Sequence, residues 1–332
     1  MTDSSLPPAA PAPSRPLREP GAPRPGRAKP KGEVLILSRR RGLYSTRRLV
    51  EATRQQGRRA RVVDTLGCTV VTGRGPAQLL VSGRPLRNVE VVIPRIGTSI
   101  TGYGLAVVRQ LELMGHPVLN GSEGIARSRD KLRALQLLAA GGLDVPRTAM
   151  AHPGVEPARL VESVGGLPVV IKLLRGTQGV GVMLASSLQE VRTLLGTFAG
   201  LGQEVVLQEF VAESAGRDLR ALVVGERVVA AMQRSSTAGD FRSNLHRGGQ
   251  GGAVPISDAF ASVAVRAARL MGLEVAGVDL LLGREGPRVL ELNSSPGLEG
   301  IESTTGIDVA GAILSHALSL PAATRPAEQA RD

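Results

Sequence analysis

The 332-residue chain has one cysteine, no tryptophan and only 2% aromatic residues. The lone cysteine, Cys68, excludes a disulfide within the chain and a thiolate cage for a metal ion. The histidines show no spacing that is typical of metal ligands. No run of 18 apolar residues occurs, and the first residues lack the apolar core of a signal peptide. These absences predict a cytoplasmic protein with no membrane segment.

Acidic residues are outnumbered, since 41 Lys and Arg face 29 Asp and Glu, and the formal net charge is +12. A basic protein favours anionic partners such as nucleotides, acidic peptides or RNA. A general enrichment in arginine would explain the exposed positive charge equally well. RNA-binding surfaces usually stack bases on aromatic side chains, so the shortage of aromatic residues argues against direct nucleic-acid binding.

Residues 1–32 lack periodic apolar residues and are rich in Pro, Ala and Arg. Such a segment cannot bury enough apolar surface to order itself, so we predict a disordered extension. Residues 33–121 alternate strand and helix patterns, which predicts a small α/β domain with a parallel sheet. Its expected strands are 33–37, 61–64 and 89–97, its expected helices are 45–56 and 101–114, and a hairpin is expected within 79–86 with its turn at Ser82-Gly83.

Residues 122–320 mix antiparallel hairpins with helices, so the expected class changes from α/β to α+β. We divide this region into one lobe of 122–203 and a second of 204–320, followed by a tail of 321–332. The expected helices are 129–140, 187–198 and 257–271, and the expected strands are 146–150, 167–173, 204–210, 218–224, 227–233, 274–283 and 287–293.

Acidic and amide side chains interrupt two apolar strand patterns near the C-terminus. Asp279 lies within AGVDLLL, and Glu291 and Asn293 lie two residues apart in VLELN, just before a Pro-Gly break. The turn GREG between these runs predicts a hairpin that brings the three side chains together. Buried carboxylates need a cation or protons, and oxygen ligands of this kind suit Mg²⁺ or Mn²⁺. Asp279 alone is better explained as a strand-edge residue or a cap of the next turn.

A glycine-rich loop follows the strand that contains Lys172. The stretch VVIKLLRGTQGVGVML places residues 176–181 between two strands, where backbone N–H groups can bind phosphate oxygens. It is not a P-loop, because no Lys-Ser/Thr follows the glycines, and a strand rather than a helix comes next. Lys172 would add a positive charge for the phosphates. The alternative is a flexible hairpin with a surface lysine.

Two further polar stretches lie in the second lobe. LQEFVAESAGRDLR has Glu209 at a strand end and then Asp218 and Arg220 between apolar residues. These side chains suit either contacts with an amine or a ribose, or a solvent-facing strand edge. The long loop GDFRSNLHRGGQGG contains Arg242 and Asn244. Arginine there would bind carboxylates or neutralise a transferred phosphoryl group, and an exposed surface loop is the alternative.

Six stretches together resemble one family. They are IPRIGTSITGYG, ARSRDKL, VVIKLLRGTQGVGV, GDFRSNLHRGG, AGVDLL and ELNSSPGLEGIESTTGID. They closely resemble the ATP-grasp ligases of the RimK type, the ribosomal protein S6–L-glutamate ligases, and the resemblance extends from about Glu33 to about Leu320. It implies an ATP-grasp fold, in which an N-terminal α/β domain precedes two α+β lobes that clasp ATP. It also implies a homotetramer.

The resemblance implies positions for ATP and for metal ions. Two Mg²⁺ or Mn²⁺ ions per subunit would be bound by Asp279, Glu291 and Asn293. ATP would be bound by Lys131 and Lys172 at the phosphates, by the loop residues Gly176, Gln178, Gly179 and Gly181, by Glu209 and Phe210 at the adenine, by Asp218 at the ribose, and by Arg242, Ser243 and Asn244.

The family's chemistry joins L-glutamate to the C-terminus of ribosomal protein S6. A carboxylate attacks the γ-phosphate of ATP to give an acyl phosphate, and the amine of glutamate then displaces phosphate. No covalent enzyme nucleophile is needed. Our candidate catalytic residues are Arg220, Arg234 and Arg242, which would bind carboxylates or the acyl phosphate. Where relatives have Glu-Arg-Arg, this chain has Gln233-Arg234-Ser235, which affects the prediction of the acceptor.

Two other hypotheses stay open. The same chemistry would join glutamate or another amino acid to a small-molecule, coenzyme or carrier-protein carboxylate. In a different class, the chain would be a non-catalytic ATP- or RNA-binding regulatory protein. The presence of Asp279, Glu291 and Asn293 argues against the last hypothesis, because a protein without catalysis need not keep all three.

Overall fold

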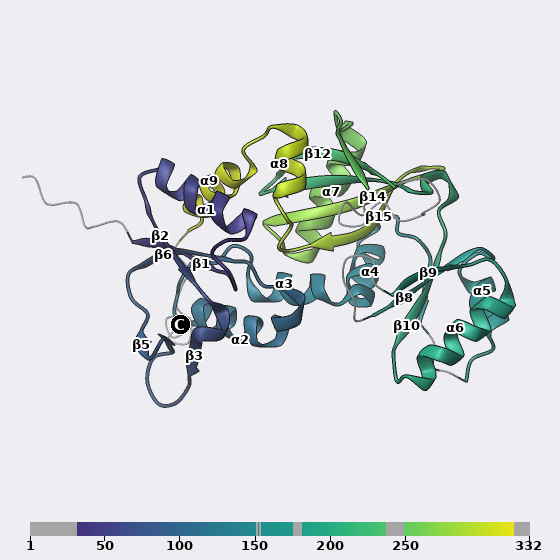
Figure 1. The fold of residues 1–332 in the computed structure, drawn as a ribbon, viewed down its shortest axis with the longest axis horizontal. Helices are drawn as coiled ribbons and strands as arrows, with labels where there is room; N and C mark the ends of the chain where they lie inside the picture. The colour runs from purple at the N-terminus through teal and green to yellow at the C-terminus, as the bar shows by residue number, and fades with distance from the viewer. Residues whose placement is uncertain (1–31, 151, 153, 175–180, 237–248, 322–332) are drawn as a thin grey trace, which may run out of the picture. The chain divides into compact units, whose positions relative to one another are not determined.

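A computed structural model describes residues 32–150, 152, 154–174, 181–236 and 249–321 of the chain (Figure 1). The predicted extension therefore lies outside the described residues except for Gly32, and the predicted tail lies outside them except for Pro321. Within these ranges, no helix is long and apolar enough to cross a membrane.

The first part of the chain forms the parallel sheet that the sequence predicts. Successive strand residues point to opposite faces, so Val34 and Ile36 pack into one core while Leu35 and Leu37 pack into another. Helices cover both faces of the sheet, and two more helices from near the C-terminus pack on the face of Val34 and Ile36. This burial on both faces explains why the strand is a continuous apolar run. The strand order is β2 (Arg59–Val63), β1 (Glu33–Leu37) and β6 (Val89–Pro94), and the helices are α1 (Tyr44–Gln55) and α2 (Thr101–Leu113).

A small antiparallel sheet contains the predicted hairpin. Its turn has Ser82 at φ 50° and Gly83 at φ 75°, and this left-handed backbone suits a tight hairpin. The sequence analysis missed the strand that pairs with it on the other side. The strands are β3 (Cys68–Val71), β4 (Gln78–Val81) and β5 (Arg84–Pro85).

The helix predicted at 129–140 is present over 131–140, and a separate helix that was not predicted precedes it. α3 (Ser122–Arg129) ends where Asp130 adopts an extended backbone, and α4 (Lys131–Ala140) begins there. The Asp130 carboxylate accepts a hydrogen bond from the Arg133 N–H at 3.0 Å, which caps the second helix. Lys131 therefore lies in the first turn of a helix, next to a change in chain direction.

A four-stranded antiparallel sheet follows. The sequence analysis assigned one of its strands, residues 204–210, to the second lobe, but in the structure this strand pairs with strands of the first lobe. The apolar face of the sheet packs against two helices, of which the first, α5 (Pro157–Ser163), was not predicted. The strand order is β7 (Thr148–Met150), β10 (Val205–Glu209), β8 (Val169–Leu173) and β9 (Val182–Ala185), and the second helix is α6 (Leu188–Gly200).

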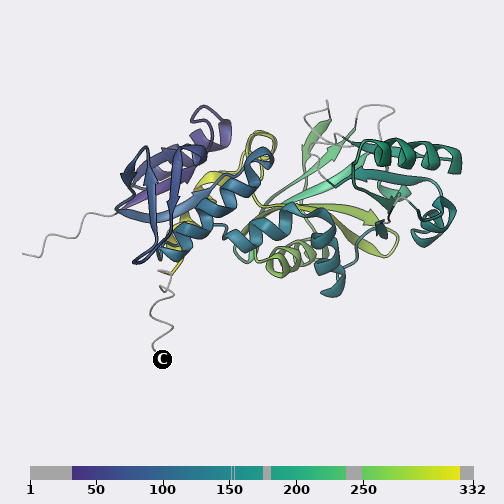
Figure 2. The ribbon, with the colours of Figure 1, turned by 90° about the horizontal axis from the view of Figure 1, so that it is seen from below.

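A five-stranded antiparallel sheet forms the remaining part, with α7 (Asp258–Met271) along one face (Figure 2). The hairpin predicted around GREG is confirmed, with its turn at Gly283–Gly286. The strands predicted at 218–224 and 227–233 also pair with each other. The strand order is β13 (Gln250–Ala253), β12 (Arg227–Ser235), β11 (Arg217–Val224), β14 (Val275–Gly283) and β15 (Gly286–Asn293).

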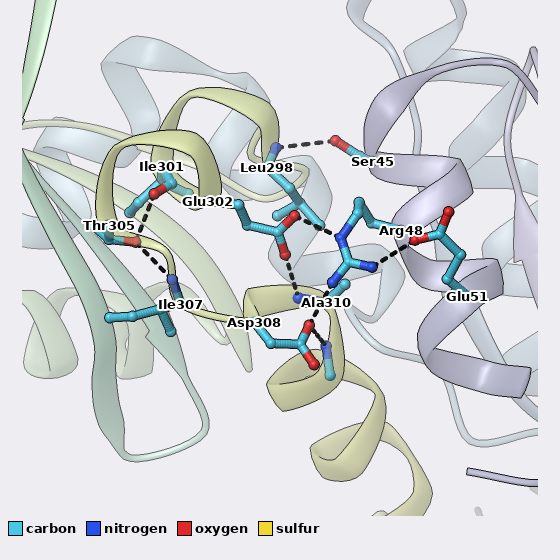
Figure 3. Close-up of polar contacts among 11 residues, drawn as sticks. Ser45, Arg48, Glu51, Leu298, Ile301, Glu302, Thr305, Ile307, Asp308 and Ala310 are labelled. Carbon is cyan, nitrogen blue, oxygen red and sulfur yellow. Dashed lines mark hydrogen bonds and ion pairs between the residues drawn. The ribbon is translucent and has the colours of Figure 1, made fainter. Parts of the chain in front are cut away.

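Two helices that the sequence analysis missed follow this sheet, α8 (Glu299–Thr305) and α9 (Val309–Ser319). Both pack with α1 in one apolar core. Figure 3 shows the polar contacts above that core. Arg48 of α1 donates to Glu302 at 3.0 Å and to Asp308 at 2.8 Å, and Ser45 accepts from the Leu298 N–H at 3.0 Å. The N-terminal helix α1 thus holds the segment that comes directly after β15.

Candidate active site

Strand register aligns charged side chains across the five-stranded sheet. Asp218 of β11 is opposite Arg234 of β12, and Arg220 of β11 is opposite Asp279 of β14. Asp279 is in turn opposite Glu291 of β15. We call Arg234, Asp218, Arg220, Asp279 and Glu291 the charge row. The sequence prediction that Asp279 and Glu291 meet is confirmed by this register.

Hydrogen bonds hold most of the charge row together. Arg234 donates to both carboxylate oxygens of Asp218 at 2.6 Å each and lies 2.8 Å from Asp279 Oδ2. Arg220 donates to both oxygens of Asp279 at 2.7 Å each. The side chains of Arg234 and Asp218 are 4% exposed and that of Asp279 is 2% exposed, so water does not screen these pairs. Two of the three arginines predicted to bind substrate therefore already hold acidic residues of the protein.

The two facing carboxylates have opposite pKa shifts. Burial alone would raise the pKa of Asp279, but Arg220 and Arg234 more than offset it and hold that pKa well below the usual range. Glu291 is exposed at the end of the charge row, although nearby protein atoms displace part of the water around its carboxylate. This crowding and the adjacent Asp279 carboxylate raise the pKa of Glu291. The charge row thus ends in two negative groups, of which only the inner one is paired with arginine.

A cation would suit the end of the charge row. The Asn293 amide lies on β15 opposite Gly277, two register pairs from Asp279 and Glu291, and its Oδ1 accepts from the Ser295 N–H at 3.0 Å. No group of three His, Cys, Asp or Glu side chains is placed to hold a metal among the described residues. The donor set is therefore two carboxylates and one amide, all with oxygen atoms, which fits Mg²⁺ or Mn²⁺. The raised pKa of Glu291 fits it too, because a bound cation would relieve the repulsion from Asp279.

Two lysines interact electrostatically with the Glu291 carboxylate. Lys172 of β8 donates to Gln208 Oε1 at 2.5 Å, and Lys131 donates to the Leu173 carbonyl at 2.9 Å. Burial lowers the pKa of Lys172 to about 8, an effect that Lys131 strengthens and Glu291 weakens. Burial also lowers the pKa of Lys131. Two poorly solvated ammonium groups near one carboxylate form a site that favours an anion with several charges, such as a polyphosphate.

Glu209 has a different environment from the one expected of an adenine contact. Arg288 of β15 donates to both of its carboxylate oxygens at 2.8 Å, and the Arg147 N–H donates to Oε2 at 3.0 Å. The bond from Arg288 holds the pKa of Glu209 below its usual value. The Glu209 side chain therefore links β10 to β15, so contacts with a base at this strand end would have to use the backbone or the neighbouring Phe210.

Several predicted site residues lie outside the part of the chain that the structure describes. These are Gly176, Gln178 and Gly179 of the glycine-rich loop and Arg242, Ser243 and Asn244 of the second loop. The last glycine of the first loop, Gly181, is described and has φ 72°. A Cβ at this position would approach Leu173 to 2.3 Å, so only glycine fits where the loop returns to β9.

Sequence reasoning missed two arginines, Arg95 and Arg129, as candidate site residues. Arg95 comes directly after β6, at the carboxyl end of a parallel strand, where ligands of open α/β sheets bind. Its Nη2 donates to the Pro296 carbonyl at 2.5 Å, three residues after Asn293. The motif Pro94-Arg95 at a strand end was the available signal, but its contact with residue 296 depends on tertiary structure.

Two family models match the chain. The RimK PreATP-grasp domain matches residues 33–125, and the RimK-like ATP-grasp domain matches residues 128–317. A protein of Alkalilimnicola ehrlichii named probable alpha-L-glutamate ligase is 53% identical over 280 residues, which cover 84% of this chain and 93% of that protein. A protein of Ectopseudomonas mendocina with the same name is 50% identical over 284 residues, covering 86% and 94%.

Solved structures have a similar fold. The ATP-grasp ligase PsnB, complexed with a phosphomimetic variant of its minimal precursor, Mg and ADP, has a TM-score of 0.67 at 23% identity, covering 87% of this chain and 98% of that one. A RimK domain protein from Sphaerobacter thermophilus has a TM-score of 0.64 at 21% identity, covering 86% and 100%. At these identities the likeness concerns the fold alone.

Proposed function

We propose, from the premise that this chain belongs to the RimK-like ATP-grasp family, that it adds L-glutamate to the C-terminal carboxylate of ribosomal protein S6. Membership makes the chain a ligase that couples ATP to joining a carboxylate and an amine, with an ATP-grasp fold and a pre-ATP-grasp N-terminal domain. Glutamate as the amine substrate is supported by the names of relatives about half identical over most of the chain. The S6 acceptor is supported by the stretches GDFRSNLHRGG and SPGLEGIESTTGID.

The proposed reaction has two steps. An oxygen of the acceptor carboxylate bonds to the γ-phosphorus of ATP, and the bond from that phosphorus to the β-γ bridging oxygen breaks, which releases ADP. The nitrogen of glutamate then bonds to the acyl carbon and loses a proton to solvent, and inorganic phosphate leaves. Both steps move negative charge between oxygens, so the enzyme mainly positions groups and neutralises charge.

The observation that carries the proposal is the unbalanced end of the charge row beside two lysines. Lys172 and Lys131 would bind the phosphate oxygens of ATP, because their ammonium groups are poorly solvated and gain most from an anion. Asp279, Glu291 and Asn293 would hold two Mg²⁺ or Mn²⁺ ions. When bound, such ions neutralise phosphate charge.

Each arginine of the charge row has its own proposed role. Arg234 holds Asp218 and Asp279 and is almost fully buried, so its role is to position Asp279. Arg220 is 16% exposed and is the better candidate for contact with a carboxylate or the acyl phosphate. Both carboxylate oxygens of Asp218 accept hydrogen bonds from Arg234, so a ribose hydroxyl would have to bond to the remaining lone pairs of these oxygens. Arg242 stays a candidate from the sequence alone.

The test of the proposed function is the intact mass of ribosomal protein S6 from the same organism after incubation with the enzyme, ATP, Mg²⁺ and L-glutamate. We expect a series of added glutamyl residues that requires ATP. Unchanged S6 with glutamate-dependent ADP release on another acidic acceptor would assign a different acceptor to the same ligase. No ADP release with any acceptor would favour a regulatory ATP-binding protein. The cytoplasmic location and the homotetramer stay predictions.

A further inference from the structure

Two arginines outside the charge row lie near each other, and one of them contacts the segment after β15. Arg95 follows β6, and its Nη2 donates to the Ser295 carbonyl at 3.4 Å and to the Pro296 carbonyl at 2.5 Å. Arg129 is the last residue of α3, and it donates through Nη1 to Thr98 Oγ1 at 2.9 Å and through Nη2 to the Ile96 carbonyl. Both guanidinium groups thus bond to neutral oxygens, and the remaining N–H groups of Arg95 are not used within the described residues.

The charges of these two arginines are not balanced locally. Over the described ranges, neither Arg95 nor Arg129 forms an ion pair with a carboxylate, whereas Arg220, Arg234 and Arg288 all do. Burial and the neighbouring Arg129 charge lower the pKa of Arg95 to about 10, and burial lowers the pKa of Arg129. Two partly buried like charges side by side are unfavourable unless an anion joins them.

Within the part of the chain that the structure describes, polar atoms without partners occur on Arg129 itself and on the two residues that follow Asn293. Arg129 Nε and the hydroxyls of Ser294 and Ser295 are buried without a hydrogen-bond partner among the described residues. Ser294 and Ser295 come directly after Asn293, and Ser295 is the residue whose carbonyl Arg95 contacts. Buried polar groups without partners are rare in native proteins and often lie where a ligand completes the set.

A further contact connects this cluster to the charge row. Pro296 packs against Gly277, where an added Cβ would lie 3.0 Å from Pro296 Cβ and 3.9 Å from Arg220 Nε. Gly277 therefore allows the turn after Asn293 to lie close to β14 and Arg220. Arg95 bonds to that turn, so it contacts the segment that comes directly after Asn293, one of the three proposed metal ligands.

We propose that Arg95 and Arg129 bind a carboxylate of the incoming glutamate, and this rests on the proposed function. Free glutamate brings two carboxylates to the reaction, and neither is consumed by it. One must therefore be matched by a positive group that is not already neutralised, and guanidinium binds carboxylate through two parallel hydrogen bonds. The Ser294 and Ser295 hydroxyls would serve as additional donors. Arg95 and Arg129 thereby determine which amine substrate is accepted.

The test uses the full chain with R95Q and R129Q, and R127Q as the matched control. Arg127 lies on the same helix as Arg129 but pairs with Glu123 at the surface. In steady-state kinetics we expect the KM for L-glutamate to rise roughly tenfold to a hundredfold in R95Q and R129Q, the range expected for a lost hydrogen bond to a charged group. The KM for ATP should stay within about twofold, and R127Q should match the wild type.

A purely structural role would give a different result. If Arg95 only holds the turn after Asn293, R95Q should raise the KM for ATP and for glutamate together, and this outcome would overturn the proposal. Unchanged KM for glutamate in both variants would overturn it as well. R95K separates the two roles further, because it keeps the charge but loses the bidentate geometry, and should lie between wild type and R95Q.

A binding measurement makes the test independent of turnover. With saturating ADP and Mg²⁺, L-glutamate should raise the unfolding temperature of the wild type and of R127Q, because a ligand that binds only the folded state stabilises it. R129Q should lose this rise while keeping the rise caused by ADP. A rise in R129Q equal to that of the wild type would refute the proposal. If the wild type itself shows neither glutamate binding nor glutamate-dependent ADP release, the proposed function fails instead.

Discussion

Replacing Arg234 by methionine should destabilise the protein more than any other single change in the charge row. Arg234 bonds to Asp218 through two hydrogen bonds of 2.6 Å and lies 2.8 Å from Asp279. Methionine fills a similar volume but leaves two buried carboxylates without that positive charge. Breaking a buried ion pair by removing one partner costs about 3–5 kcal/mol, against a total stability of roughly 5–15 kcal/mol for a native protein.

R220M is the comparison that makes this prediction specific. It removes one partner from Asp279 but leaves Arg234 in place, and Arg220 is 16% exposed rather than 4%. We expect a loss of about 1–3 kcal/mol, as for one hydrogen-bonded charge that water can partly replace. Adding D218N to R234M should recover part of the stability, because one of the two uncompensated charges is then removed.

Urea-induced unfolding at neutral pH, followed by circular dichroism, measures these differences in the free energy of unfolding. The effect of R234M should change little when the salt concentration is raised, because the pairs are buried. A value for R234M within about 1 kcal/mol of the wild type would refute the reasoning. So would an R220M variant as unstable as R234M, because Arg234 would then not be the residue that holds both carboxylates.

Three further predictions concern catalysis, pH and fold. N293A should reduce ATP turnover at least a hundredfold, because one proposed metal ligand is lost. Its unfolding temperature should be unchanged, since the Asn293 side chain bonds only to the Ser295 N–H within the described residues. Retained metal-dependent ADP production would contradict the metal assignment. ATP affinity should fall as pH rises through about 8, where Lys172 loses its proton because burial has lowered its pKa from the usual range. In K172R this fall should be absent, because arginine stays charged, and an equal fall in both proteins would assign it to another group. R48A should lower the free energy of unfolding by about 1–3 kcal/mol, because Glu302 is 6% exposed and loses its bond to Arg48. The control is T193A, a change on the exposed face of α6, which should have little effect on the free energy of unfolding.

The sequence predicts the hairpin of β14 and β15 well, for identifiable reasons. Two apolar runs flank the turn GREG, and the acidic residues interrupt those runs at positions that the turn brings together. The structure has Gly283 opposite Gly286 and Asp279 opposite Glu291. Local turn chemistry and alternation of side chains were sufficient here, because both strands are neighbours in sequence.

Helices α8 and α9 could not be predicted in the same way. α9 is apolar around most of its circumference, so it shows no helical period. Its core neighbours include α1 and β6 near the start of the described chain as well as β11 and β12. α8 has only seven residues and no side-chain cap. It is held by Ser45 and Arg48, about 250 residues earlier in the sequence. Its stability thus comes from tertiary contacts rather than from local propensity.

The roles of the arginines depended on register, which sequence alone does not give across non-adjacent strands. Arg220 and Arg234 were predicted to bind substrate, but β11 lies between β12 and β14, and this order places them against Asp218 and Asp279. Oppositely charged cross-strand pairs stabilise a sheet, so these two arginines balance the acidic residues to which they are adjacent. Arg95, which follows a strand of a different sheet, and Arg129, on a helix, are by contrast not balanced by any described carboxylate.

The distribution of charge along the charge row explains why ATP should bind next to Glu291. Two arginines and three carboxylates form the row, and the excess negative charge lies at Glu291, the residue farthest from Arg234. The positive charges of Lys172 and Lys131 partly offset the negative charge of Glu291, but both ammonium groups are poorly solvated. Lysines and carboxylates that are each incompletely satisfied can be satisfied together by a polyphosphate with its cations, because the phosphates attract the lysines and the cations attract the carboxylates. Because the bound cations and the phosphates also neutralise each other, nucleotide and metal ions should bind cooperatively, with each raising the affinity for the other.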